Sequence, residues 1–220
     1  MNETSAREAI RAVGASLHAR GYVHATAGNI SVQLDDGTFL ITPTDSSLGT
    51  LDASCLSHVD GEGQHVGGDR PSKTLTLHRR ILQAAQRFDP ATCCVIHTHS
   101  THAVALTLMD TSAELLPPIT PYFVMKVGHV PHVPYARPGD AAVAEQVAGL
   151  IASYGERGAP IRGVVLSRLG PVVWHESPAA AMAVLEELEE TARLVVLAGT
   201  RDPLPEAAID ELRKTFGARW

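Results

Sequence analysis

A short apolar run is followed by two histidines that lie two residues apart, in the segment Cys93-Cys94-Val95-Ile96-His97-Thr98-His99. The run contains β-branched residues, so it predicts a buried strand over 93–96. Side chains alternate between the two faces of a strand, so His97 and His99 should leave it on one side, close enough to share a cation. Imidazole suits Zn²⁺ or another borderline divalent metal. The alternative is that these are two ordinary surface or core residues among 11 histidines.

Three other stretches are rich in hydroxyl groups, and each lies next to a predicted element. They are His24–Val32, Thr42–Ser47 and Asp69–Thr74. Gly28-Asn29 permits a turn whose N–H groups can cradle a phosphate. Ser72 and Lys73 precede a predicted helix, where N-terminal amides point outward and attract anions. Each stretch alone is as easily a plain loop or an ordinary N-cap, but together they resemble a phosphate pocket.

The helices and strands that must position these residues can be predicted from hydrophobic periodicity and from Gly, Pro and capping residues. We predict helices over 5–20, 75–88, 103–109, 141–154, 179–198 and 205–216, and strands over 31–33, 38–42, 55–59, 93–96, 161–167 and 171–174. Residues 117–123, rich in proline, are expected to be extended. Glu186, Glu187, Glu189 and Glu190 are expected on the solvated face of their helix. Central strands flanked by helices indicate an α/β or α+β class with one sheet.

Composition narrows the class of protein. The chain has 220 residues, 45% of them hydrophobic, which predicts one domain over 1–220. The net charge of −6 comes without a basic stripe, which argues against nucleic-acid binding. We expect no membrane span, because no apolar run reaches about 18 residues. We expect no signal peptide, because residues 1–20 include Glu3, Arg7, Glu8 and Arg11. Three cysteines, an odd number without a disulfide framework, favour reduced thiols and a cytoplasmic protein.

Four sequence blocks carry a family resemblance: ATAGNISV (25–32), LITPTDSSLG (40–49), RPSKT (70–74) and VIHTHSTHA (95–103). Two later blocks, TPYFVMKVG (120–128) and VPYARPGD (133–140), add to it. In these blocks the chain resembles the class II aldolase/adducin family, from about Ala6 to Ala198. The last two look most like its sugar-acid branch, which includes 3-oxo-tetronate 4-phosphate decarboxylases and is similar to L-fuculose-phosphate aldolase.

The resemblance implies a three-layer α/β fold with a central, mostly antiparallel sheet. It implies a homotetramer with sites between subunits, and a divalent metal, usually Zn²⁺, that polarises a substrate carbonyl and stabilises an enolate. His97 and His99 match two metal ligands, and Tyr122 matches a tyrosine that reaches a neighbouring subunit's site. Positions that match the surroundings of the substrate and its phosphate are Thr26, Gly28, Asn29, Thr44, Ser72 and Lys73.

Three positions depart from the family pattern. Thr74 stands where the family usually has an acid/base glutamate, and a threonine hydroxyl does not titrate near neutrality. Leu169 stands where the third metal ligand, a histidine in an Asn-His-Gly turn, is usual. Asp45 replaces a glycine next to Thr44. A catalytic zinc site usually has three protein ligands, and His102, His129 and His175 are candidates for the third, with His175 the least attractive.

The first hypothesis is a metal-dependent lyase, a decarboxylase or aldolase acting on a small phosphorylated sugar acid through a metal-stabilised enolate. Decarboxylation needs no base for bond cleavage, so it tolerates Thr74 better than aldol cleavage does. Tyr122 or water could supply the later proton. The second hypothesis is an inactive homologue that serves as a binding or scaffold subunit. The third is a related lyase that works without a metal.

Overall fold

The computed structural model describes residues 1–220 and has one eight-stranded sheet in the order β4-β3-β2-β1-β5-β8-β7-β6. The strands are β1 (Asn29–Gln33), β2 (Phe39–Ile41), β3 (Ser57–Val59), β4 (His65–Gly67), β5 (Cys94–His97), β6 (His132–Val133), β7 (Gly163–Leu166) and β8 (Gly170–His175). Every neighbouring pair is antiparallel except β6 and β7. The predicted, mostly antiparallel central sheet is therefore confirmed.

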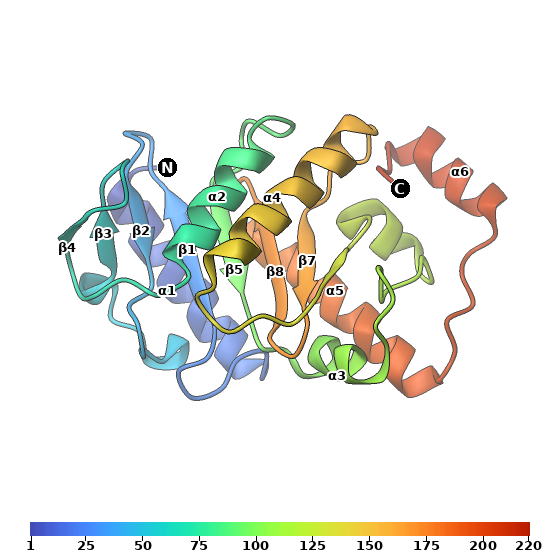
Figure 1. Cartoon of the computed structure of the whole chain (residues 1–220), viewed down its shortest axis with the longest axis horizontal. Coiled ribbons are helices and arrows are strands. Elements are labelled where there is room, and N and C mark those ends of the chain that lie inside the picture. The colour runs from blue at the N-terminus through green and yellow to red at the C-terminus, as the bar shows by residue number, and fades with distance from the viewer.

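Helices cover both faces of this sheet, which confirms the three-layer α/β class (Figure 1). They are α1 (Glu3–Ala19), α2 (Leu75–Ala85), α3 (Thr101–Met109), α4 (Ala141–Glu156), α5 (Pro178–Ala198) and α6 (Glu206–Phe216). In Figure 1, α2 and α4 lie in front of the sheet and α1 and α5 lie behind it. None of these helices combines the length and apolar composition needed to cross a bilayer.

Strand β5 is apolar on both faces because it separates two hydrophobic cores. Cys94 and Ile96 belong to the core that includes α1 and α5, and Val95 belongs to the core that includes α2 and α4. This alternation follows from the two-residue period of a strand. Burial on both faces explains why the sequence before His97 reads as a continuous apolar run.

Some predicted elements differ from the observed ones. Strand β4 was not predicted, and the strand expected over 55–59 begins only at Ser57. The prediction of an extended segment over 117–123 is wrong at its end, because a π-helix, η3, spans Phe123–Val127. The hydroxyl of Thr120 accepts a hydrogen bond from the Phe123 amide at 3.1 Å. Pro121 fits there because a helix's first turn needs no proline N–H.

Glu189 was predicted to face solvent and is instead 4% exposed. Its carboxylate accepts hydrogen bonds from the backbone amides of His102 and Ala103, at 2.8 and 3.1 Å. It also accepts one from Nδ1 of His102 at 2.9 Å. These amides lie in the first turn of α3, where helical N–H groups lack partners. A carboxylate on α5 thus anchors the start of α3, directly after the His97–His99 segment.

Replacing Glu189 with alanine should destabilise the protein by about 2–3 kcal/mol, since hydrogen bonds to a buried charged group are lost and two amides lose their partner. Glu190 is the matched control on the same helix, because it is exposed and pairs only with Arg193. Urea unfolding of both variants measures the difference. A small and equal decrease in the free energy of unfolding for Glu189→Ala and Glu190→Ala would contradict this role of Glu189.

Helix α2 buries a histidine against the sheet. The hydroxyl of Ser31 on β1 lies 2.8 Å from Nδ1 of His78, and the two form a hydrogen bond. Burial, with a smaller effect from nearby His97, lowers the pKa of His78 from 6.5 to about 3. The folded protein therefore holds His78 neutral at a pH where the unfolded chain binds a proton.

Stability should consequently fall as the pH decreases from about 6.5 toward 3, because only the unfolded state takes up this proton in that window. His78→Asn keeps a donor near Ser31 and removes the titrating group, so its urea midpoint should depend less steeply on pH. The comparison is made in the presence of a chelator. Parallel pH profiles for the wild type and His78→Asn would show that His78 does not carry the effect.

Candidate functional site

The site begins where β1 and β5 pair. Asn29 at the start of β1 lies opposite His97 at the end of β5, and His97 lies opposite Val172 on β8. Asn29 and His97 are both buried. The glycine-containing loop before β1 and the histidine segment after β5 therefore meet at the same end of these two central strands.

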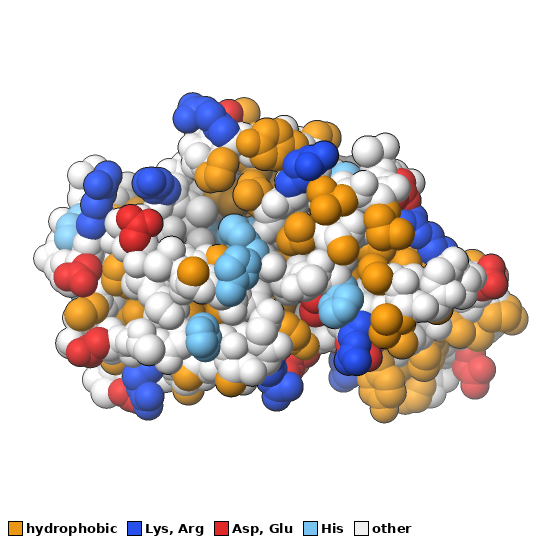
Figure 2. All heavy atoms as spheres, turned by 90° about the horizontal axis from the view of Figure 1, so that it is seen from below, with side chains coloured by type: hydrophobic (Ala, Val, Ile, Leu, Met, Phe, Trp, Pro, Cys, Tyr) orange, Lys and Arg blue, Asp and Glu red, His pale blue; other side chains and the backbone are white.

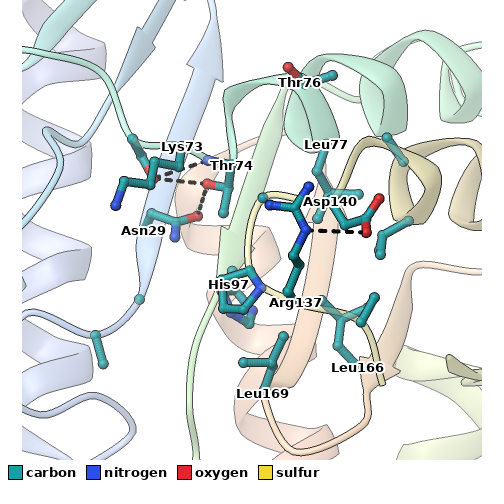
Figure 3. A pocket seen from close by; sticks show the side chains of 18 of the residues that line it. Asn29, Lys73, Thr74, Thr76, Leu77, His97, Arg137, Asp140, Leu166 and Leu169 are labelled. Carbon is teal, nitrogen blue, oxygen red and sulfur yellow. Dashed lines mark hydrogen bonds and ion pairs between the residues drawn. The ribbon is translucent and has the colours of Figure 1, made fainter. Parts of the chain in front are cut away.

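A cavity of about 250 Å³ opens at this end of the strands. The predicted residues that line it are Thr26, Gly28, Asn29, Thr44, Ser72, Lys73, Thr74, His97 and His99. Figure 3 shows Asn29, Lys73 and Thr74 on one side of it, with His97 and Leu169 below them. Tyr122 does not line this cavity, and it is 62% exposed.

The ring centres of His97 and His99 lie 5.0 Å apart. The carbonyl oxygen of Pro171 lies 2.9 Å from Nδ1 of His97, and because a carbonyl can only accept, Nδ1 must carry the proton. Nε2 then keeps its lone pair, as in histidines that bind metals. Burial and neighbouring His99 lower the pKa of His97 to about 4, and burial and His24 lower the pKa of His99. Both rings are therefore suited to hold a cation.

The structure does not gather a third ligand around this pair. No three His, Cys, Asp or Glu side chains converge as a metal-binding group. Leu169 lines the cavity and has no donor atom. The three predicted candidates all lie outside the cavity lining: His102 is held by Glu189, His129 by Glu114, and His175 by the Glu176 amide.

Thr74 orients a neighbouring side chain. Its hydroxyl donates to Oδ1 of Asn29 at 2.9 Å and lies 3.0 Å from the hydroxyl of Ser72. The bond fixes the amide orientation of Asn29 and leaves its NH₂ group available to a ligand. Thr74 therefore serves in positioning, and it supplies no group that titrates near neutral pH.

Two basic side chains line the cavity, Lys73 and Arg137. Lys73 precedes the first turn of α2, whose unpaired amides favour an anion. Arg137 comes from the loop before α4, and its Nε lies 3.8 Å from a carboxylate oxygen of Asp140 (Figure 3). Asp45 and Asp140 also line the cavity; Asp45 is exposed to solvent, and Asp140 is the partner of Arg137. The wall can thus bind an anionic substrate even though the chain is acidic overall.

Sequence reasoning did not identify Arg137 as a site residue, although it lies within the block VPYARPGD. It also missed His24, whose ring centre is 6.4 Å from that of His99. Figure 2 shows the molecule from below the view of Figure 1, and histidine side chains lie beside a central hollow there. His24 and His99 are separated by 75 positions in the sequence (99 − 24), so their proximity is visible only in the folded structure.

Comparisons with known proteins place this site in a family. The model of the "Class II Aldolase and Adducin N-terminal domain" matches residues 8–196. A 3-oxo-tetronate 4-phosphate decarboxylase from Cupriavidus necator is 50% identical over 99% of both chains. Its namesake from Escherichia coli K12 is 41% identical over 90% of both chains.

Solved structures agree with this assignment. The crystal structure of YgbL from Escherichia coli matches with a TM-score of 0.85 and 41% identity, covering 96% of this chain and 99% of that one. An L-fuculose 1-phosphate aldolase shares the fold with a TM-score of 0.80 and 23% identity, covering 99% and 98% of the two chains. The chain therefore belongs to the class II aldolase and adducin family and groups with its lyases.

Proposed function

We propose that the protein is a metal-dependent carbon–carbon lyase that decarboxylates a 3-oxo-tetronate 4-phosphate or a similar phosphorylated sugar acid. The observation that carries the proposal is the cavity itself, where the imidazoles of His97 and His99 share one space with hydroxyl, amide and cationic groups. The names of relatives that match nearly the whole chain support the same substrate class.

The two anionic ends of such a substrate need separate partners. The phosphate fits the region of Ser72, Lys73 and the N-terminal amides of α2, where Thr26, Gly28 and Asn29 belong to the same cavity lining. Arg137, with its planar guanidinium, suits the carboxylate or an outer phosphate oxygen. Lys73 and Arg137 together offset the charge that the substrate brings into the cavity.

Decarboxylation places few demands on the residues of this chain. As the bond to the departing carboxylate breaks, its electron pair passes into an enolate, and CO₂ leaves without any base. A divalent cation held by His97 and His99, which we take to be Zn²⁺, would supply the Lewis acid for the ketone. The carbanion carbon then needs one proton, from water or from Tyr122 of a neighbouring copy of the chain. Aldol cleavage also needs a base for the substrate hydroxyl, which Thr74 cannot provide.

The direct test incubates the Zn²⁺-loaded protein with a 3-oxo-tetronate 4-phosphate labelled with ¹³C at the carboxylate. We expect labelled CO₂ at a rate that a chelator abolishes and Zn²⁺ restores. Release of an aldehyde without CO₂ would assign aldol cleavage instead. Substrate binding without turnover under any metal would favour the alternative of a binding or scaffold subunit.

Lys73→Ala and Arg137→Ala should each raise KM by about 10–100-fold, since each removes a charge-assisted hydrogen bond to the substrate. Arg87 provides the control, because it is exposed and its nearest carboxylate, on Glu156, is 3.9 Å away. Steady-state kinetics on the three variants measure the effect. An unchanged KM in both Lys73→Ala and Arg137→Ala would place the substrate anions elsewhere.

We also propose that the chain forms a homotetramer with sites between subunits and acts in the cytoplasm. Tyr122, which does not line the cavity of its own chain, is exposed and available to a neighbouring copy. Cys55, Cys93 and Cys94 are free thiols, as expected in a reducing compartment. Light scattering should give four times the chain mass of 23.4 kDa. A mass of one chain at micromolar concentration would contradict the assembly.

A further inference from the structure

His24 lies in the loop that leads into β1, two residues before Thr26 begins the cavity lining. Its imidazole ring is edge-on to that of His99, with the ring centres 6.4 Å apart. The side chain is exposed, and neither ring nitrogen has a hydrogen-bond partner in the chain. An exposed imidazole thus lies beside His99, just outside the residues that line the cavity.

The spacing of the three rings can be compared with a zinc site. With Zn–N bonds of about 2.0–2.1 Å and tetrahedral angles, the centres of two coordinating imidazoles lie about 5.2 Å apart. The separation of 5.0 Å between His97 and His99 matches this value. The separation of 6.4 Å between His24 and His99 is about 1 Å longer. Rotation of an exposed side chain on a loop covers such a distance, and it occurs on a fast timescale.

Several other histidines are held by partners elsewhere in the fold. The Nδ1 atoms of His102 and His129 are bound by Glu189 and Glu114. His78 is bonded to Ser31 through Nδ1, and its Nε2, which has no partner, is enclosed in the core. Leu169, which lines the cavity, offers no donor. Besides His97, His24 is the histidine whose ring packs near that of His99, which is why we single it out.

We propose that His24 completes the metal site of this protein as its third imidazole ligand. This inference rests on the proposed function, because it assumes a divalent cation at His97 and His99. It gives this chain three protein ligands and an open position for substrate, the usual arrangement of a catalytic zinc. It also explains how Leu169 can occupy the cavity wall without leaving the metal with only two ligands.

The test measures Zn²⁺ affinity of the purified, metal-free protein by competition with a chromophoric chelator. His24→Ala should weaken binding by at least about 100-fold, because losing a ligand costs more than the roughly 10–100-fold that losing a partner of a ligand costs. His97→Ala serves as the positive control. His65→Ala serves as the matched negative control, since His65 is also exposed but lies on β4 at the sheet edge.

A second variant separates ligand loss from damage to the loop. In His24→Ala/Leu169→His a new imidazole comes from a position that lines the cavity, and Zn²⁺ affinity should recover by roughly tenfold or more. X-ray absorption of the zinc-loaded wild type should show three imidazoles, and His24→Ala should show two. Circular dichroism confirms that each variant is folded.

Failure of the His24 inference can be distinguished from failure of the proposed lyase function. If His24→Ala binds Zn²⁺ as tightly as the wild type while His97→Ala does not, the His24 inference is wrong and the proposed metal pair stands. If the wild type binds no Zn²⁺, the His24 inference is also wrong. In that case the decarboxylation assay decides separately whether the lyase function stands without a metal.

Discussion

The antiparallel pairing of β1 with β5 is the constraint on which the site depends. It sets Asn29 opposite His97 and so brings two loops from distant parts of the sequence together at one end of these strands. Because β5 is buried on both faces, sliding it by one residue would turn His97 into the opposite core. The register is therefore strongly specified by the hydrophobic cores, and the position of the imidazole follows from it.

The layers around this strand pair supply the rest of the site from fixed positions. Helix α2 begins at Leu75, so Ser72, Lys73 and Thr74 meet the cavity just before its first turn. Helix α5 sends the Glu189 carboxylate to the start of α3, which holds the chain directly after His99. The loop before α4 brings Arg137. A site assembled this way is held mainly by rigid elements, which limits motion of the catalytic groups.

Much of this arrangement could be predicted from local sequence patterns. The two-residue spacing of His97 and His99 and the apolar run before them indicated the strand end and the ring pair. The hydroxyl-rich stretches around Asn29, Thr44 and Ser72 indicated the cavity wall. Proximity across the sequence could not be predicted in the same way. Glu189 belongs to a charged run that normally faces water, and only the packing of α3 against α5 shows that it is buried.

The same limit applies to His24 and Arg137. Each lies in a loop whose conformation is set by the elements it joins, and nothing in the adjacent residues shows which cavity the loop meets. The substitutions at positions 74 and 169 were visible in the sequence as departures from the family pattern. Their consequence needed the structure, which shows Thr74 bonded to Asn29 and Leu169 on the cavity wall.

The central claim is that one cavity holds both the cation and the phosphorylated substrate. Crystallography of the protein with Zn²⁺ and a non-hydrolysable phosphonate analogue tests it most directly, with anomalous scattering at the zinc edge to locate the metal. The account predicts zinc against the imidazoles of His97 and His99 and the phosphonate against Ser72 and Lys73. Zinc or phosphonate bound only outside this cavity would contradict it.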